Sequence, residues 1–407
     1  MHPLTMRIQL WSYNYGPEPT GIAPVSCVLA EGLLKRGHDV DVVAAHPHYP
    51  WPEWGRRLLP YREVRFGVPL LRLPLWIGRA TATERYRQEL TFTAAQFAAL
   101  PTLRRTDVQV VVSPSFPALT AAIANARTRR IPMVLWLQDI LPDGAAATGL
   151  VEQGIVLNFA RRLEQAAYRE SKRIIVPSMS FTENLGRKGV DLAKVHLVHN
   201  PATRVPRAEP SRHVPASTDE VRLLAMGNIG FSQGLAPIVR AIEAAPPSFT
   251  PRIRLIIAGT GVAADALARE IRSERIEMLG LVDDDRLEQE LELATVALVS
   301  QDRLDGEFNV PSKLMNFMRY GLPVLAVVHP DSEVARIIRD AGAGWVVDSA
   351  TPEEVPRQLA AVIRSPEGLD SFRDAAASYA ERHFDPDRFV DAFEHNLAEV
   401  APPKRAA

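Results

Sequence analysis

The residues with the clearest chemistry lie in one short segment, 306–326. Its polar loop contains Glu307, and Lys313 places a positive charge just after Pro311 and Ser312, which are typical of a helix start. We expect the Ser312 side chain to cap that helix. A helix N-terminus binds anions, because it offers unpaired N–H groups and partial positive charge. The carboxylate, the amides and the lysine suit a ligand with hydroxyls at one end and a diphosphate at the other, such as a nucleotide sugar.

Two glycine-containing loops could hold the phosphates of such a ligand. One is 16–22, which contains Gly21, and the other is 225–235; each follows an apolar stretch and opens a predicted helix. Glycine at such a place lets the backbone approach a phosphate closely. An ordinary strand-to-helix turn is the alternative interpretation of both loops. The candidate binding residues of the second loop and of the next strand end are Gly227, Asn228, Gly230, Gln233 and Gly259.

Asp139 is a candidate for orienting or deprotonating a hydroxyl group of a substrate. It follows a buried strand in the segment 136–143, where a carboxylate could orient or deprotonate a hydroxyl. The alternative is that Asp139 only ties the loop. We expect Asp143 to cap the next helix.

Alternating strands and helices, in two successive blocks, must position these residues. Continuous apolar strands such as Val108–Ser113 and Val324–Val328 are typical of a parallel sheet that is covered on both faces. The sequence therefore predicts an α/β fold with two doubly wound, Rossmann-like domains, whose ligand crevices lie at strand carboxyl ends. The predicted divisions are a first domain at 1–200, a linker at 201–219, a second domain at 220–385 and a terminal helix within 386–407.

Segment 306–326 resembles the donor-site signature of glycosyltransferase family 4, the retaining enzymes with a GT-B fold. Gly321-Leu322-Pro323-Val324 fits the end of the family pattern. The second glutamate of that pattern is replaced by Asn316, and Glu307 fits the first only if the loop is one residue longer. The Pro-Ser-Lys-Leu-x-Asn form resembles the branch that builds capsule and exopolysaccharide, such as colanic acid.

The resemblance covers nearly the whole chain and implies a reaction. A sugar would move, with retention of configuration, from a nucleotide-diphosphate sugar to a hydroxyl of a saccharide or polyprenyl-diphosphate-linked acceptor. The donor would bind mainly to the second domain and the acceptor, near Asp139, to the first. The last helix would cross back to the first domain.

The resemblance also implies individual roles in the donor site. Gly21, the Ser312 helix end and Lys313 would stabilise the diphosphate, Glu307 would hold the sugar hydroxyls and Asn316 the ribose. Family members often have arginine and lysine where this chain has Asn228 and Gln233, so Lys313 becomes the principal cation. The remaining implied contacts, which include the nucleotide base, are Leu281, Val282, Asn309, Val310 and Pro311.

Composition narrows the classes of function. The chain has 407 residues, a net charge of −1 and one cysteine, Cys27, so we expect no disulfide and no nucleic-acid partner. No signal core and no apolar run of 18 residues is present, so we expect a cytoplasmic protein.

We expect no cofactor besides the donor and no metal. Asp283, Asp284 and Asp285 should cap a helix, and His46, His48 and His199 should be satisfied loop or surface residues, since they have no zinc spacing.

The stretch 51–105 mixes tryptophan, tyrosine and arginine. This composition suits a lipid headgroup interface and predicts peripheral contact with the inner face of the membrane. A solvated loop and an ordinary helix are the alternative.

Two other functions stay open. One is a nucleotide-sugar 2-epimerase, which shares the fold but needs a pair of acid and base residues. The other is a non-catalytic partner subunit that binds a nucleotide sugar, which the amides at Asn228, Gln233 and Asn316 leave open.

Overall fold

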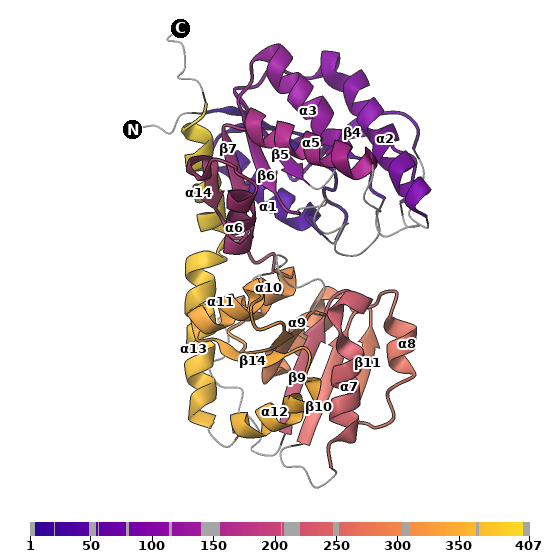
Figure 1. Ribbon diagram of the computed structural model, residues 1–407, viewed down its shortest axis with the longest axis vertical. Coiled ribbons are helices and arrows are strands. Elements are labelled where there is room, and N and C mark those ends of the chain that lie inside the picture. Colours follow the sequence, from indigo (N-terminus) through magenta and orange to yellow (C-terminus); the bar gives the residue numbers. More distant parts are fainter. Residues whose placement is uncertain are drawn as a thin grey trace. The chain divides into compact units, whose positions relative to one another are not determined.

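The computed structural model contains two compact α/β units, coloured along the sequence in Figure 1. Unit 1 consists of Met1–His199 and Pro386–Ala407, and unit 2 consists of Asn200–Asp385. The structure describes residues 5–19, 21–48, 54–55, 57–78, 81–113, 116–139, 155–204, 206, 220–246, 252–302, 310–363 and 366–401. The first residues of the predicted linker belong to unit 2, where the Ala202 N–H donates to the Phe384 carbonyl at 2.8 Å. Residues 207–219 of that linker lie outside the described residues.

Unit 1 is built on an eight-stranded sheet in the order β3-β4-β2-β1-β5-β6-β7-β8. Its strands are β1 (Arg7–Ser12), β2 (Asp39–Ala45), β3 (Tyr61–Arg65), β4 (Val68–Leu73), β5 (Val108–Ser113), β6 (Met133–Leu137), β7 (Arg173–Val176) and β8 (Val195–Leu197). All pairs are parallel except β3 with β4 at one edge. β5 and β6 are buried throughout, as expected for apolar strands with helices on both faces.

Six helices of unit 1 surround this sheet among the described residues. They are α1 (Ala23–Lys35), α2 (Ala82–Ala99), α3 (Phe116–Arg129), α5 (Ile155–Glu170), α6 (Met179–Arg187) and α14 (Pro386–Ala398), with short 3₁₀ turns at Leu100–Thr102 and Leu192–Lys194. α2 packs against α3, α3 against α5, and α1 against α14. A capping box of Thr81 and Glu84 starts α2.

The C-terminal helix α14 belongs to unit 1, as predicted, and an apolar surface holds it there. Trp136 of β6 packs edge-on against Phe393 at 4.9 Å between ring centroids. Gly32 of α1 lets the helices approach closely, because a Cβ at this position would lie 2.4 Å from a methyl group of Val390. The last helix is therefore part of the unit 1 core.

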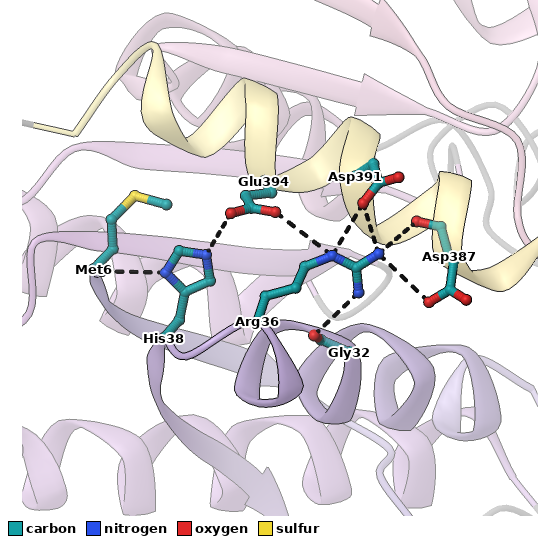
Figure 2. A network of polar contacts seen from close by, with 7 residues as sticks. All are labelled: Met6, Gly32, Arg36, His38, Asp387, Asp391 and Glu394. Carbon is teal, nitrogen blue, oxygen red and sulfur yellow. Dashed lines mark hydrogen bonds and ion pairs between the residues drawn. The ribbon is translucent and has the colours of Figure 1, made fainter. Parts of the chain in front are cut away.

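A polar network, shown in Figure 2, joins the same two helices. The Arg36 guanidinium contacts Asp391 at 2.6 Å and Asp387 at 3.4 Å. His38 lies beside it, with Nε2 at 3.0 Å from Glu394 and Nδ1 at 3.2 Å from the Met6 N–H. Because the Met6 N–H can only donate, Nδ1 is an acceptor and the ring is neutral, with its proton on Nε2. These contacts fix where α14 lies along α1.

Unit 2 is built on a six-stranded parallel sheet in the order β11-β10-β9-β12-β13-β14. Its strands are β9 (Glu220–Met226), β10 (Arg252–Ala258), β11 (Ile276–Gly280), β12 (Val296–Ser300), β13 (Val324–Val328) and β14 (Gly344–Asp348). Its helices are α7 (Leu235–Ala244), α8 (Ala264–Ala268), α9 (Asp284–Leu293), α10 (Ser312–Arg319), α11 (Glu333–Ala341), α12 (Val355–Ile363) and α13 (Pro366–His383), with 3₁₀ turns at Phe231–Gln233 and Pro352–Glu354. One hydrophobic cluster contains residues of α9, α10, α11 and α13, and a second contains residues of α7, α8 and α12.

The predicted fold class is confirmed: both units are doubly wound α/β structures. The sequence did not predict the β3–β4 hairpin, which occupies part of the aromatic and arginine-rich stretch 51–105. In the described part of the chain, no helix is both long and apolar enough to cross a membrane.

Candidate functional site

The start of α10 presents backbone N–H groups without a side-chain cap. The N-cap residue is Pro311, which has extended backbone angles and makes no capping hydrogen bond. Our prediction that Ser312 caps the helix is wrong, because Ser312 is already the first helical residue and its side chain is exposed. Val310 lies just before this turn, and Glu307 and Asn309 lie outside the described residues. An uncapped helix start is the more accessible anion site, since its N–H groups have no side-chain acceptor.

Lys313 lies in that first turn and contacts the loop after β9. Its Nζ donates to Gln233 Oε1 at 2.7 Å, and its Cε lies 4.0 Å from where a Cβ on Gly227 would be. Burial lowers the pKa of Lys313 to about 8. The partner is a neutral amide, and no ion pair of Lys313 occurs in the residues that the structure describes. The lysine charge is thus available to an anion at the helix start.

The glycine loops after β9 and β10 touch backbone to backbone. The Gly227 N–H donates to the Ala258 carbonyl at 2.9 Å, and the Ile229 N–H donates to the Thr260 carbonyl at 2.9 Å. A Cβ on Gly259 would lie 1.8 Å from the Gly227 carbonyl oxygen, so only glycine fits there. Gly230 and Asn228 complete the first loop, where a Cβ on Gly230 would lie 3.2 Å from Asn228 Nδ2. The predicted residues of these two loops therefore lie together, and they lie beside Lys313.

Asn316 has a role that the sequence did not predict. Its side chain is buried, and Oδ1 accepts hydrogen bonds from the Thr203 N–H at 2.9 Å and the Arg204 N–H at 3.1 Å. The amide oxygen therefore holds the start of the linker to α10. A contact with ribose would have to come from the amide nitrogen, and it stays a prediction.

The turn after β11 contains the residues predicted to meet a nucleotide base. Leu281 is 81% exposed and Val282 is partly exposed. Asp283 follows and accepts a hydrogen bond from the Arg286 N–H at 2.8 Å, so it caps α9 as predicted. No cluster of three metal-ligating side chains occurs among the described residues.

In unit 1, the predicted residues lie at strand carboxyl ends. Gly21 has a φ of +66° just before α1, and no atom lies within 4 Å of its potential Cβ. Asp139 is partly buried two residues after the end of β6, and Asp143 lies outside the described residues. How either unit 1 residue contacts a ligand stays a prediction.

Sequence reasoning missed a buried polar group in the first loop of unit 1. We expected His46 and His48 to be satisfied loop or surface residues; both lie in the loop after β2 and His48 is hydrogen-bonded there, but neither is a surface residue, since both are at most 3% exposed, and His48 contacts the equally buried Glu18. A carboxylate between two prolines in a short loop, Pro17-Glu18-Pro19, was the available signal. Its partner comes from another loop 30 residues away, and spacing does not reveal such a contact.

Two protein-family profiles match this chain. The glycosyl transferase 4-like domain matches residues 20–201, and the glycosyl transferases group 1 domain matches residues 220–365. The chain belongs to glycosyltransferase family 4.

Relatives of this glycosyltransferase extend the comparison. WcaI of Escherichia coli, named as a colanic acid biosynthesis glycosyl transferase, is 26% identical over 96% of this chain and 100% of its own length. Anabaena HepE, solved in complex with UDP, has a TM-score of 0.70 at 14% identity over 97% of this chain and 100% of its own. WaaG, named as a glycosyltransferase involved in lipopolysaccharide biosynthesis, has a TM-score of 0.64 at 16% identity over 95% of this chain and 99% of its own. The structural likenesses show the GT-B fold.

Proposed function

We propose that this glycosyltransferase moves a sugar, with retention of configuration and without a metal, from a nucleotide-diphosphate sugar to a hydroxyl acceptor. The observation that carries the proposal is the arrangement in unit 2 of Lys313, the uncapped start of α10 and the Gly227 loop. Lys313 and the start of α10 offer a positive charge and N–H donors within one turn of helix, and the Gly227 loop lies beside them.

The mechanism follows from where negative charge develops. As the bond to the sugar breaks, charge accumulates on the leaving diphosphate, and fixed donors stabilise it there. Lys313 supplies the full charge and the first-turn amides of α10 supply the partial charge. Gln233 accepts from Lys313 through its oxygen, so its NH₂ group faces elsewhere and can donate. We assign the donor sugar to Glu307 and the activation of the acceptor hydroxyl to Asp139.

The comparisons support the substrate classes. HepE was solved with UDP and with UDP-glucose, which favours a nucleotide-sugar donor here. The names of WcaI and WaaG favour an acceptor in polysaccharide or lipopolysaccharide synthesis, either a saccharide or a polyprenyl-diphosphate-linked intermediate.

A mass-spectrometric screen tests the reaction. UDP, GDP, dTDP and CDP sugars are each incubated with the protein, with and without saccharide acceptors, and nucleotide release and product mass are recorded. We expect one class of donor to be hydrolysed slowly and to transfer its sugar. Nucleotide binding without turnover would favour the partner-subunit alternative, and a change of configuration at C2 without transfer would favour the epimerase.

We also propose that part of unit 1 contacts the inner membrane face. Eight of the fifteen exposed large hydrophobic side chains among the described residues lie within the stretch 58–97, and we call this group the 58–97 surface: Leu58, Leu59, Val64, Phe66, Trp76, Tyr86, Leu90 and Phe97. Arginines lie over its aromatic rings, with Arg87 at 3.8 Å from the Trp76 centroid and Arg65 at 5.2 Å from that of Phe66. Apolar side chains beside cations suit an anionic lipid headgroup layer.

A further inference from the structure

A buried polar network lies at the carboxyl edge of the unit 1 sheet, in the loop that contains Gly21. It joins Asn14, two residues after β1, to Glu18 and to His48 in the loop after β2. Glu18 and His48 are each 2% exposed, whereas Asn14 is partly exposed. The network thus connects a buried carboxylate to the amide of a partly exposed residue.

Glu18 determines which way the Asn14 amide faces. Its Oε1 accepts from the His48 backbone N–H at 3.0 Å, and its Oε2 lies 3.0 Å from Asn14 Nδ2. An ionised carboxylate only accepts hydrogen bonds, so the NH₂ group of Asn14 must face it. The carbonyl oxygen of the same amide therefore faces away from Glu18.

His48 imposes the same orientation. Its Nδ1 lies 2.9 Å from the His46 carbonyl oxygen and 3.3 Å from Glu18 Oε1, so Nδ1 holds a proton, and in the tautomer with that single proton Nε2 is an acceptor. That acceptor lies 3.4 Å from Asn14 Nδ2, which directs the second amide hydrogen into the network as well. Within the described residues, no group donates to Asn14 Oδ1. The loop therefore holds an oriented hydrogen-bond acceptor on a partly exposed residue.

We propose that Asn14 Oδ1 binds a hydroxyl of the saccharide acceptor, with Glu18 and His48 as positioning residues. This inference rests on the proposed function. Doubly wound sheets bind ligands at the carboxyl ends of their strands, and Asn14 lies at such an end. Gly21 lies in the same loop as Asn14, but a carbonyl oxygen cannot donate a hydrogen bond to a phosphate, so Asn14 Oδ1 suits the second substrate and not the donor diphosphate. An oriented acceptor selects groups that can donate, as a sugar hydroxyl can.

Three variants test the orientation. Asn14→Ala removes the oxygen, and we expect the acceptor KM to rise about three- to tenfold while donor hydrolysis is unchanged. Glu18→Gln places an NH₂ group against the amide, so the amide turns its own NH₂ outward and the acceptor KM should rise similarly. In Asn14→Asp/Glu18→Gln, the new amide donates to one oxygen of the new carboxylate and the other oxygen faces outward. This double variant should regain most of the lost acceptor affinity.

Glu164→Gln is the matched control. Glu164 is also 2% exposed in unit 1 and accepts from Tyr168 Oη and Lys188 Nζ, each at 2.8 Å. The same substitution there alters a buried carboxylate outside the network, so the acceptor KM should not change. The probes are octyl α- and β-glycosides of glucose, galactose and mannose, with the donor that the nucleotide-sugar screen selects. Thermal unfolding of every variant separates lost affinity from lost folding.

The outcomes separate this inference from the proposed function. A wild type that transfers sugar, with Asn14→Ala equally effective or altered only in its donor KM, overturns the role of Asn14 alone. A double variant no better than Glu18→Gln overturns the positioning role, and it does so even where Asn14→Ala fails to fold. A wild type that hydrolyses the donor but transfers to none of the six glycosides overturns the inference of a simple saccharide acceptor, whereas the proposed function fails only if a polyprenyl-diphosphate-linked acceptor receives no sugar either.

Discussion

At the residue scale, the environment of Lys313 bears most directly on how the site would bind a diphosphate. It is the cation beside the Gly227 loop, and its partner Gln233 is neutral. Burial lowers its pKa to about 8, because the charged form is poorly solvated. A bound diphosphate would favour the charged form again, so ligand binding and protonation of Lys313 should be coupled.

Nucleotide affinity should therefore fall as the pH rises through about 8, where Lys313 loses its proton. Calorimetric titration of UDP across that range, in buffers of different ionisation heat, should show proton uptake on binding. Lys313→Arg is the control, because arginine keeps its charge and should remove the pH dependence. A wild-type affinity that is flat across the range would mean that Lys313 does not contact the phosphates.

The stability of the ligand-free protein should change in the opposite direction. The folded pKa of Lys313 lies below its unfolded value, so the unfolded chain binds the proton more tightly between about 8 and 10.5. The contribution of this lysine to stability therefore rises with pH in that window. Denaturant unfolding of wild type and Lys313→Met at both ends of the window measures it, and parallel changes in the two proteins would contradict it.

Local sequence predicted much of the site. Gly227, Gly259, Gln233 and Lys313 lie together because each follows a predicted strand or opens a predicted helix, and the sheet brings those ends to one edge. The Ser312 cap was wrong because the helix begins one residue earlier than a capping serine requires. The contact of Asn316 Oδ1 with Thr203 spans 113 residues, so no local pattern could predict it.

At the element scale, the interface of α1 with α14 is the feature most easily tested. Gly32→Ala should destabilise unit 1 by about 1–3 kcal/mol, because the new methyl group would overlap Val390 and over-packed cores lose about that much. Thermal and denaturant unfolding measure the change.

Gly186→Ala is the control for that substitution. Gly186 is also helical, in α6, but its potential Cβ lies 3.6 Å from the nearest atom, an ordinary contact. Alanine there should stabilise the helix by about 0.5–1 kcal/mol. If both variants shift stability equally, close packing of α14 on α1 is not what holds the last helix.

Buried strands were predicted accurately from the sequence, whereas the exposed edge strand was not. β5 and β13 match the predicted ranges residue for residue, since continuous apolar runs mark buried parallel strands. The β3–β4 hairpin was not predicted, because β3 is an edge strand in which exposed Arg62 and Val64 alternate with partly buried residues. A charged, half-exposed strand resembles a loop when its sequence is considered alone.

At the scale of the whole molecule, the 58–97 surface should determine membrane binding. Wild type should sediment with phosphatidylglycerol vesicles and much less with phosphatidylcholine vesicles, since its arginines favour anionic lipid. Leu58→Ser/Phe66→Ser should weaken sedimentation several-fold, because both side chains are more than two-thirds exposed. Leu192→Ser/Leu293→Ser, at 49% and 51% exposed positions elsewhere, is the control and should sediment like wild type. Equal loss in both double variants would argue against a specific membrane surface.

Transfer activity should survive EDTA. Lys313 and the α10 helix start supply the positive charge that a metal supplies elsewhere, so the diphosphate does not require a cation. Assays after chelation, with and without added manganese, measure this. Activity that disappears with EDTA and returns with manganese would show that a metal ion bridges the diphosphate.

One measurement tests the central claim most directly, namely calorimetric titration of UDP and GDP into wild type, Lys313→Ala and Lys313→Arg at matched ionic strength. A charge-assisted contact to phosphate contributes about 1.5–3 kcal/mol, so Lys313→Ala should bind the preferred nucleotide roughly ten- to a hundredfold more weakly. Lys313→Arg should lose less, because it keeps the charge but presents a broader group. Equal dissociation constants for wild type and Lys313→Ala would contradict the assignment of the diphosphate to this site.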